Sequence, residues 1–159
     1  MNIFVLHTNP DTAARQQCDK HVVKMTLESA QLMATALVLN NLPSPYKPTH
    51  RNHPCAVWAR ANRNNFSWLL QHHLAMLDEY TKRFNKVHAC AEHQHYWQAA
   101  LNHLPDTPQT AFAQAMPVDL KIPGDAVTAY RNFYLRDKAY FARWTLTPVP
   151  DWWQPKEIQ

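Results

Sequence analysis

The sequence is almost without glycine, and this scarcity narrows both the fold and the kinds of nucleotide site that it can build. Gly124 is the only glycine among 159 residues, whereas glycine usually makes up roughly 7% of a globular chain. The hairpins and bulges of β-rich folds depend on glycine, so a β-rich fold is not expected. Neither a P-loop nor a dinucleotide-binding loop can be built from one glycine. A bound nucleotide would therefore be held by side chains and helix N-termini.

Cysteines and long apolar runs are also scarce. Cys18, Cys55 and Cys90 are odd in number and lie far apart, which favours reduced thiols over a disulfide framework. The longest apolar run, near residues 32–39, is too short and too mixed to span a membrane, and the N-terminus lacks the pattern of a signal peptide. We therefore expect a cytoplasmic protein without a membrane partner. The net charge of +4, with ten histidines besides, favours an anionic partner.

Apolar residues recur at intervals of three and four, which predicts a mostly α-helical chain. The twelve prolines cluster between the periodic stretches and mark where helices end. The predicted helices cover residues 10–39, 54–84, 91–101 and 125–144. The apolar stretch 2–7 lacks a clear partner strand, so we expect a single extended segment there. The pattern predicts an all-α fold in one domain, residues 1–159: a compact bundle of about four main helices with a short extended N-terminal segment and a proline-rich C-terminal tail.

The first group of residues that could carry chemistry lies near the start of the first predicted helix. Lys20, Lys24 and Glu28 follow one another at intervals of four and share a helix face, with Asp19 and His21 beside them. Carboxylates and an imidazole can supply acid–base catalysis, and amines can contact phosphate. The alternative is an ordinary solvated face with ion pairs. The candidate catalytic residues are Asp19, His21 and Glu28, and the candidate ligand-binding residues are Lys20 and Lys24.

A second group occupies the loop before the second predicted helix and the first turns of that helix. Residues 46–54 read Tyr-Lys-Pro-Thr-His-Arg-Asn-His-Pro. The free N–H groups of a helix start attract anions, and the basic side chains add positive charge. Trp58 could stack on a base, although a tryptophan at such a position is more often part of the core. The candidate catalytic residues of this group are His50 and His53, and the candidate ligand-binding residues are Lys47, Asn52, Trp58 and Arg60.

A third group lies towards the C-terminus. Arg131 and Lys138 are seven positions apart and so share a face of the last predicted helix. Gln114 precedes them in a stretch that is predicted to be irregular. We assign Gln114, Arg131 and Lys138 to ligand binding. The alternative for the two basic residues is a solvated position or pairing with Asp125 and Asp137.

Metal and thiol chemistry are less strongly indicated. Residues 88–95 contain three histidines and a cysteine, but their spacing matches no structural zinc motif and no second cysteine pair follows. We therefore expect no metal ion and no cofactor. Cys18 lies close to His21 and Lys20, as an activated thiol would, although a cysteine beside a core face is more often simply buried.

The same polar blocks resemble a family of small proteins of tailed phages, the T-even gene 30.3 family. The similar strings are Cys-Asp-Lys-His-Val-Val-Lys-Met at 18–25, Tyr-Lys-Pro-Thr-His with Asn-His-Pro at 46–54, and shorter strings at 112–117 and 129–131. The resemblance covers nearly the whole chain. It implies a phage-encoded protein in the cytoplasm of an infected bacterium, with the polar blocks forming a shared site. It implies no particular activity.

Two functions are compatible with these residues. The favoured hypothesis is a nucleotide- or DNA-base-directed modifying or hydrolytic enzyme, such as a glycosidic-bond hydrolase. In it, Asp19 or Glu28 is the general base or stabilising carboxylate, because a protein that only binds phosphate has little use for acids among its lysines. The alternative is a non-catalytic binding protein that counters host defence by sequestering a nucleotide signal or a host protein. In both, a basic, histidine-rich pocket holds a nucleotide or nucleic acid.

Overall fold

The predicted all-α fold class is confirmed. The computed structural model describes residues 1–155, and these residues form helices and connecting segments without a β-strand. The α-helices are α1 (Pro10–Gln16), α2 (Asp19–Leu39), α3 (Pro54–Ala61), α4 (Arg63–Phe84) and α5 (Ala126–Phe133). Two 3₁₀ helices, η1 (Ala89–His103) and η2 (Val118–Leu120), and a π-helical segment, η3 (Tyr134–Lys138), complete the set.

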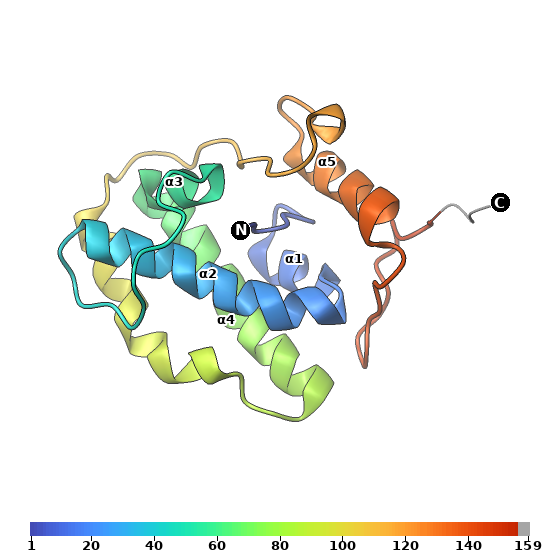
Figure 1. Cartoon of the computed structure of the whole chain (residues 1–159), viewed down its shortest axis with the longest axis horizontal. Helices are drawn as coiled ribbons and strands as arrows, with labels where there is room; N and C mark the ends of the chain where they lie inside the picture. The colour runs from blue at the N-terminus through green and yellow to red at the C-terminus, as the bar shows by residue number, and fades with distance from the viewer. Residues whose placement is uncertain (156–159) are drawn as a thin grey trace.

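The two long helices, α2 and α4, cross at the centre of the molecule, and the shorter elements pack around them (Figure 1). The predicted apolar face of α2 is buried; it includes Val22, Met25, Leu32 and Met33. By length and composition alone α2 could cross a membrane, but 67% of its most apolar window is buried inside the protein. Such burial is what the central helix of a helical core requires, since its apolar surface must be covered by other elements.

Two of the predicted helices are each divided into two. The predicted helix 10–39 breaks at Gln17 and Cys18, whose backbones are extended. The side chain of Gln17 is buried there and donates to the carbonyl of Ile3 at 2.9 Å, a tertiary contact that helical periodicity cannot indicate. The predicted helix 54–84 breaks at Asn62, whose side chain accepts from the N–H of Asn65 and so caps α4.

The later helices also differ from the prediction in type or in length. The predicted helix 91–101 is the longer 3₁₀ helix η1, which His88 caps by accepting from the N–H of Cys90. Asp125 caps α5 as predicted, but the predicted range 125–144 is helical only as far as Lys138. Trp144 lies beyond it and donates from its indole to the carbonyl of Gln16 on α1. The apolar spacing up to Trp144 therefore reflects packing of the chain after the helix.

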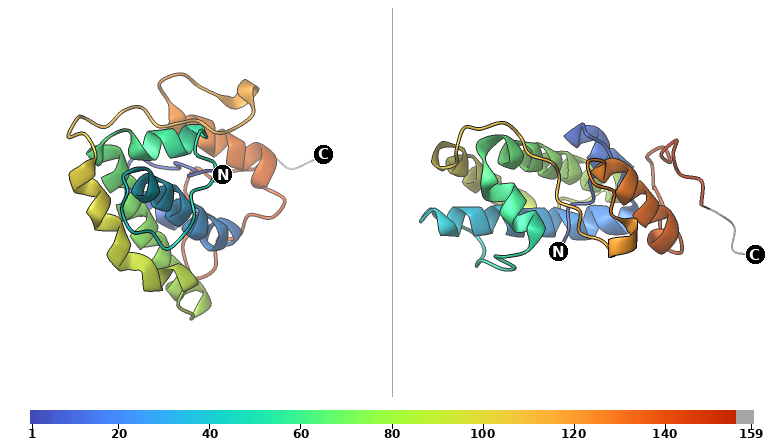
Figure 2. Two further views of the ribbon diagram at one scale, coloured as in Figure 1. Left: turned by 60° about the vertical axis from the view of Figure 1, so that its left-hand side comes forward. Right: turned by 90° about the horizontal axis from the view of Figure 1, so that it is seen from above.

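The N-terminal segment is extended, as predicted, and runs through the middle of the helices. Residues 3–6 are all buried. In the three views of Figures 1 and 2 the N-terminus lies beside α2 and next to the loop that leads into α3. The first residue of the chain therefore lies beside α2 and the loop before α3, which carry the first and second polar groups noted in the sequence.

Candidate active site

The α-amino group of Met1 forms an ion pair with Glu28 in the interior of the protein. The amine nitrogen lies 3.1 Å from Oε1 of Glu28, and the Glu28 side chain is only 10% exposed. The other carboxylate oxygen, Oε2, is buried without a hydrogen-bond partner. A buried carboxylate oxygen is normally satisfied, so this unpartnered acceptor beside a primary amine indicates a site that is built for a ligand and not for stability.

The segment behind the amine fixes its position. The Asn2 side chain accepts from the N–H groups of Ile3 and Phe4 at 2.8 and 3.1 Å and donates to the carbonyl of Ala115 at 2.7 Å. Phe4 has a φ of 56°, a conformation that is strained for a large side chain. Strain of this kind persists only where surrounding contacts enforce it, and it is common at functional sites.

The loop before α3 brings histidines to the same place. It is anchored to α2 through Thr35, whose hydroxyl donates to the carbonyl of Thr49 and accepts from the Thr49 N–H, both at 3.2 Å. His53 caps α3 by accepting at Nδ1 from the N–H of Cys55, so its neutral ring carries the hydrogen on Nε2. The pKa of His53 is lowered first by burial and then by the positive charges of the Met1 amine and His50, with Glu28 acting in the opposite direction.

On the other side of the N-terminal segment, basic side chains surround an aromatic cluster. His21 is 5% exposed, stacks on Phe4 with a centroid distance of 4.2 Å, and bonds to the Tyr134 hydroxyl at 2.6 Å. Burial, followed by Lys138, Lys24 and Lys20, lowers its pKa to about 3. His21 is therefore neutral at physiological pH.

The lysines themselves lie against the aromatic rings. The ammonium of Lys138 is 4.9 Å from the centre of the Phe133 ring, and that of Lys20 is 4.8 Å from the centre of Phe141. Within residues 1–155, neither of these lysines nor Lys24 forms an ion pair. We call Lys20, Lys24 and Lys138 the lysine cluster; it presents positive charge without an ion-pair partner around His21.

Comparison with known families identifies a family for the part of the chain that carries the Met1–Glu28 pair. The family model described as pyrimidine dimer DNA glycosylase matches residues 1–92, which include Met1, Glu28 and the loop before α3. The chain belongs to this family. Comparisons with curated proteins and with solved structures gave no match.

Membership of a pyrimidine dimer DNA glycosylase family supports the general expectation of a DNA-directed enzyme with a nucleic acid partner. The finer resemblance to the T-even gene 30.3 family is not confirmed. Phage origin, a role against host defence and a cytoplasmic location stay predictions.

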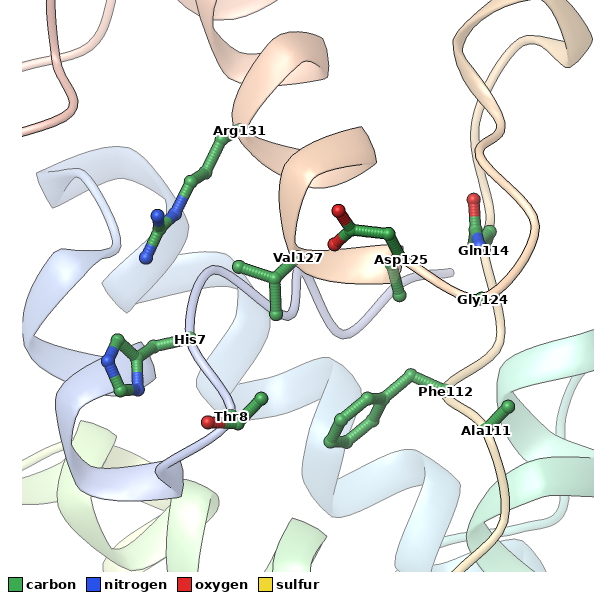
Figure 3. A pocket seen from close by; sticks show the side chains of 10 residues that line it. His7, Thr8, Ala111, Phe112, Gln114, Gly124, Asp125, Val127 and Arg131 are labelled. Atoms are coloured by element: carbon green, nitrogen blue, oxygen red, sulfur yellow. The ribbon is translucent and has the colours of Figure 1, made fainter.

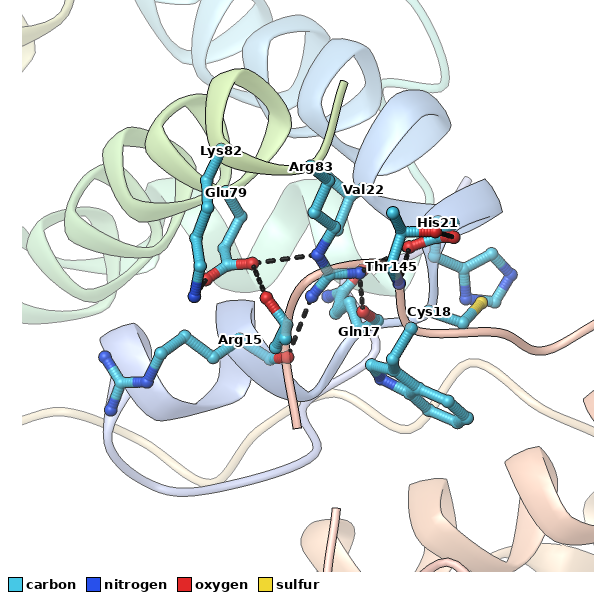
Figure 4. Close-up of polar contacts among 12 residues, drawn as sticks. Arg15, Gln17, Cys18, His21, Val22, Glu79, Lys82, Arg83 and Thr145 are labelled. Carbon is cyan, nitrogen blue, oxygen red and sulfur yellow. Dashed lines mark hydrogen bonds and ion pairs between the residues drawn. The ribbon is translucent and has the colours of Figure 1, made fainter. Parts of the chain in front are cut away.

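In this member of the glycosylase family, Asp19 lies in a structural network and not beside the amine. Its carboxylate accepts from the Thr145 N–H and hydroxyl at 2.9 and 2.6 Å and from Arg83 at 3.2 Å. The Arg83 side chain is fully buried and also donates to Glu79 at 2.8 Å and to the backbone carbonyls of Arg15 and Gln17 at the end of α1 (Figure 4). Asp19 precedes Glu28 by nine positions, which is roughly 13 Å along a helix. Asp19 and Glu28 are therefore too far apart along α2 to act on the same group, although both lie in one polar stretch of the sequence.

Three further candidates are engaged in packing or backbone contacts. Trp58 is 5% exposed and packs against Trp68 and Phe112, which fits the core alternative and not the expected base stacking. The Gln114 amide both accepts from and donates to the backbone of Ile122, so it fixes a loop. Arg131 donates from Nε to the carbonyl of Leu6 at 3.0 Å.

The remaining candidates differ in what surrounds them. Lys47 and Asn52 are exposed, whereas Arg60 is half-buried and its Nη1 has no partner. Arg131 lines an open cavity of about 330 Å³ together with His7 and Phe112. In Figure 3 its guanidinium points towards His7. Neither Met1 nor Glu28 lines this cavity, so it is separate from the amine site.

The candidate group that sequence reasoning missed is the α-amino group of Met1, which pairs with Glu28. Every chain has one α-amino group, so its presence carries no signal. The informative pattern is the apolar stretch 2–7, which begins one residue after the amine. Burial of that stretch requires the amine to approach the core, where a charged group needs a partner.

Proposed function

We propose that this protein is a DNA glycosylase that cleaves the N-glycosidic bond of a damaged pyrimidine, with the α-amino group of Met1 as nucleophile and Glu28 as the group that accepts and returns protons. The observation that carries the proposal is the buried contact of 3.1 Å between the amine and Glu28 Oε1. An α-amino group is less basic than a lysine side chain, so a larger fraction is uncharged and nucleophilic at neutral pH.

The chemistry requires these two groups and a DNA sugar. Glu28 removes a proton from the ammonium, and the neutral amine attacks C1′ of the deoxyribose. The bond between C1′ and the base nitrogen breaks, and the base takes the bonding electron pair and a proton from solvent, while the cyclobutane ring keeps it joined to the neighbouring pyrimidine. The new secondary ammonium releases a proton to solvent, and Glu28 returns its proton to the ring oxygen as the sugar opens to a Schiff base, which water hydrolyses to free the amine. The unpartnered Oε2 of Glu28 is available for that proton transfer.

The lysine cluster supports DNA as the substrate. Phosphate groups bind unpaired lysines, and a surface of such residues holds the strand in register without reading its sequence.

The C-terminal part of the chain packs against the part that matches the family. Tyr134 from η3 bonds to His21 on α2, and this contact places Lys138 beside α2. We propose that residues 1–159 act as one domain for this reason.

A non-catalytic binding protein is less well supported. Binding of phosphate needs only cations and stacking surfaces, whereas the Met1–Glu28 pair places a carboxylate and an amine, whose charges offset each other, in a buried position. Such a pair contributes little to affinity for an anion, and a buried ion pair is weak evidence for stability. The buried pair instead fits a reaction in which the amine attacks the sugar and Glu28 transfers protons.

The test is reductive trapping on duplex DNA that contains one cyclobutane pyrimidine dimer. With borohydride, the Schiff base becomes a stable amine, and we expect a covalent protein–DNA adduct that peptide mass spectrometry maps to Met1. Intact-mass analysis of the same preparation establishes that the Met1 amine is free. A variant with a few residues added before Met1 should form no adduct, whereas the same residues added after Gln159 should leave the adduct unchanged.

The other outcomes decide between mechanisms. Cleavage of the glycosidic bond without any adduct, detected as an abasic site, would mean that Glu28 activates water, and the amine would then be only its counter-ion. Absence of glycosidic cleavage in dimer-containing DNA, under conditions where the folded protein binds it, would refute the glycosylase proposal and leave a binding protein.

A further inference from the structure

We propose that Arg51 and Arg60 form an anion subsite that holds a phosphate group of the DNA strand, separate from the lysine cluster and on the other side of Glu28 along α2. The inference rests on the proposed DNA glycosylase function and adds to it a second point of contact with the substrate backbone. The Arg51–Arg60 subsite, as we call it, is formed by the loop before α3, which carries Arg51, and the last turn of α3, which carries Arg60.

Arg60 lacks the partners that a half-buried guanidinium normally has. Its Nη1 is buried without a hydrogen bond, and none of the ion pairs within residues 1–155 includes it. An unsatisfied buried donor is unfavourable. The pKa of Arg60 is lowered by burial and then by the charge of Arg51, so the nearby charge that acts on it is another cation. An anion between the two guanidinium groups would remove both penalties.

The loop holds Arg51 in place by a tight turn. His50 has a φ of 49°, and its carbonyl accepts from the His53 N–H at 2.9 Å. Thr49 is fixed to Thr35 of α2 by the two hydrogen bonds described above. Arg51 therefore projects from an ordered backbone although its side chain is exposed. A strained, well-anchored turn that carries a cation is more typical of a binding site than of a solvated loop.

The position of the subsite relative to the amine indicates a phosphate as the ligand. His53 and Arg60 are seven positions apart and share a face of α3, and His53 is close enough to the Met1 amine and Glu28 for their charges to affect its pKa. Along α2, Lys20 and Lys24 of the lysine cluster precede Glu28, while Thr35, which anchors the loop, follows Glu28 by roughly 10 Å. A strand whose sugar lies at the amine would pass both groups within a few nucleotides, and guanidinium groups bind phosphate through paired hydrogen bonds.

The experiment measures DNA affinity as a function of salt for Arg51→Gln, Arg60→Gln and the double variant. The matched control is Arg15→Gln, because Arg15 is an exposed arginine on α1 whose side chain contacts only the hydroxyl of Thr12. We expect each subsite variant to bind a dimer-containing duplex about tenfold more weakly. The slope of log affinity against log salt should fall by about 0.9 in the double variant, the value for one phosphate contact, and stay unchanged in the control.

Single methylphosphonate substitutions then locate the contact. One neutral linkage near the dimer should weaken binding by the wild type and by Arg15→Gln, but it should cause no further loss in Arg60→Gln. Equal losses in every protein at every position would overturn the subsite. We expect the melting temperature of Arg60→Gln to match or exceed that of the wild type, since the lost donor is unpartnered. If Arg60→Gln does not fold, the exposed Arg51→Gln gives the same comparison.

The same samples separate this inference from the proposed function. If the wild type binds but does not cleave the glycosidic bond, the glycosylase proposal fails while the methylphosphonate result still decides the subsite. If glycosidic cleavage is normal and the variants bind with the wild-type salt slope, the subsite is refuted and the glycosylase proposal stands.

Discussion

The two acids of α2 should respond in opposite ways to loss of their charge. Asp19→Asn removes one of the two acidic partners of the fully buried Arg83 and one of two acceptors for Thr145. A charge-assisted hydrogen bond contributes about 1.5–3 kcal/mol, and an acid in the first turn of a helix adds about 0.3–1 kcal/mol. Glu79 still partners Arg83, so we expect the free energy of unfolding to fall by about 2–3 kcal/mol. In a chain of this size, that lowers the melting temperature by roughly 4–12 °C.

Glu28→Gln should instead affect catalysis. The amide oxygen can still accept from the Met1 amine, the amine can become neutral once its counter-ion is gone, and the carboxylate oxygen that has no hydrogen-bond partner is removed. We therefore expect the free energy of unfolding to stay within about 1 kcal/mol of the wild type. The amide cannot accept or return a proton, so single-turnover cleavage of the glycosidic bond should slow by about 10²–10⁴-fold, the usual contribution of a general acid–base group.

The assay combines urea denaturation with single-turnover cleavage of the glycosidic bond in a duplex that carries one pyrimidine dimer, measured as abasic sites at saturating protein. Rates are expressed per folded molecule, so that loss of stability is not counted as loss of activity. The reasoning is refuted if Asp19→Asn lowers the rate per folded molecule as much as Glu28→Gln does while leaving stability unchanged, since Asp19 would then belong to the reaction.

Three other expectations concern pH, DNA binding and the core. Burial lowers the pKa of His21 and His73 to about 3 and that of His72 to about 4, so the unfolded chain binds more protons below its ordinary histidine pKa. The free energy of unfolding should therefore decrease as the pH is lowered, by about 4 kcal/mol between about pH 7 and about pH 5.5, as urea denaturation would measure. Unchanged stability over this range would mean that these rings are charged in the fold. Lys138→Gln should lower the salt slope of DNA binding by about 0.9 without lowering the melting temperature, and an unchanged slope in fluorescence anisotropy would exclude Lys138 from the interface. Trp58→Ala should lower the free energy of unfolding by about 3–5 kcal/mol, whereas weaker DNA binding at unchanged stability would mean that Trp58 contacts the base.

Much of the helical structure could be predicted because it depends on neighbours in the sequence. The caps at Asn9, His53 and Asp125 and the buried face of α2 follow from local spacing. The breaks at Gln17 and Asn62 could not be predicted in the same way. At Gln17 the backbone leaves the helix so that the side chain can reach the carbonyls of the N-terminal segment, and no local propensity records that contact.

The candidate site was predicted only in part, for a similar reason. The spacing of Lys20, Lys24 and Glu28 identified a polar line on one helix, but it gave Asp19 the same weight as Glu28. Which of the two acids meets the amine depends on where the N-terminal segment passes across α2. For Trp58 the sequence left stacking on a base open beside the more frequent core position, and the neighbouring Trp68 and Phe112 decide for the core.

By itself the sequence determined the fold class, the positions of most helices, and the presence of basic and histidine-rich blocks, since these follow from composition and from contacts within a few residues. Only the tertiary structure decided that the first amine of the chain meets Glu28, that the loop before α3 closes over the same place, and that Arg60 is left without a partner. These relations join residues that lie tens of positions apart. They exist because burying the N-terminal segment among the helices forces polar groups at its end to find partners away from water.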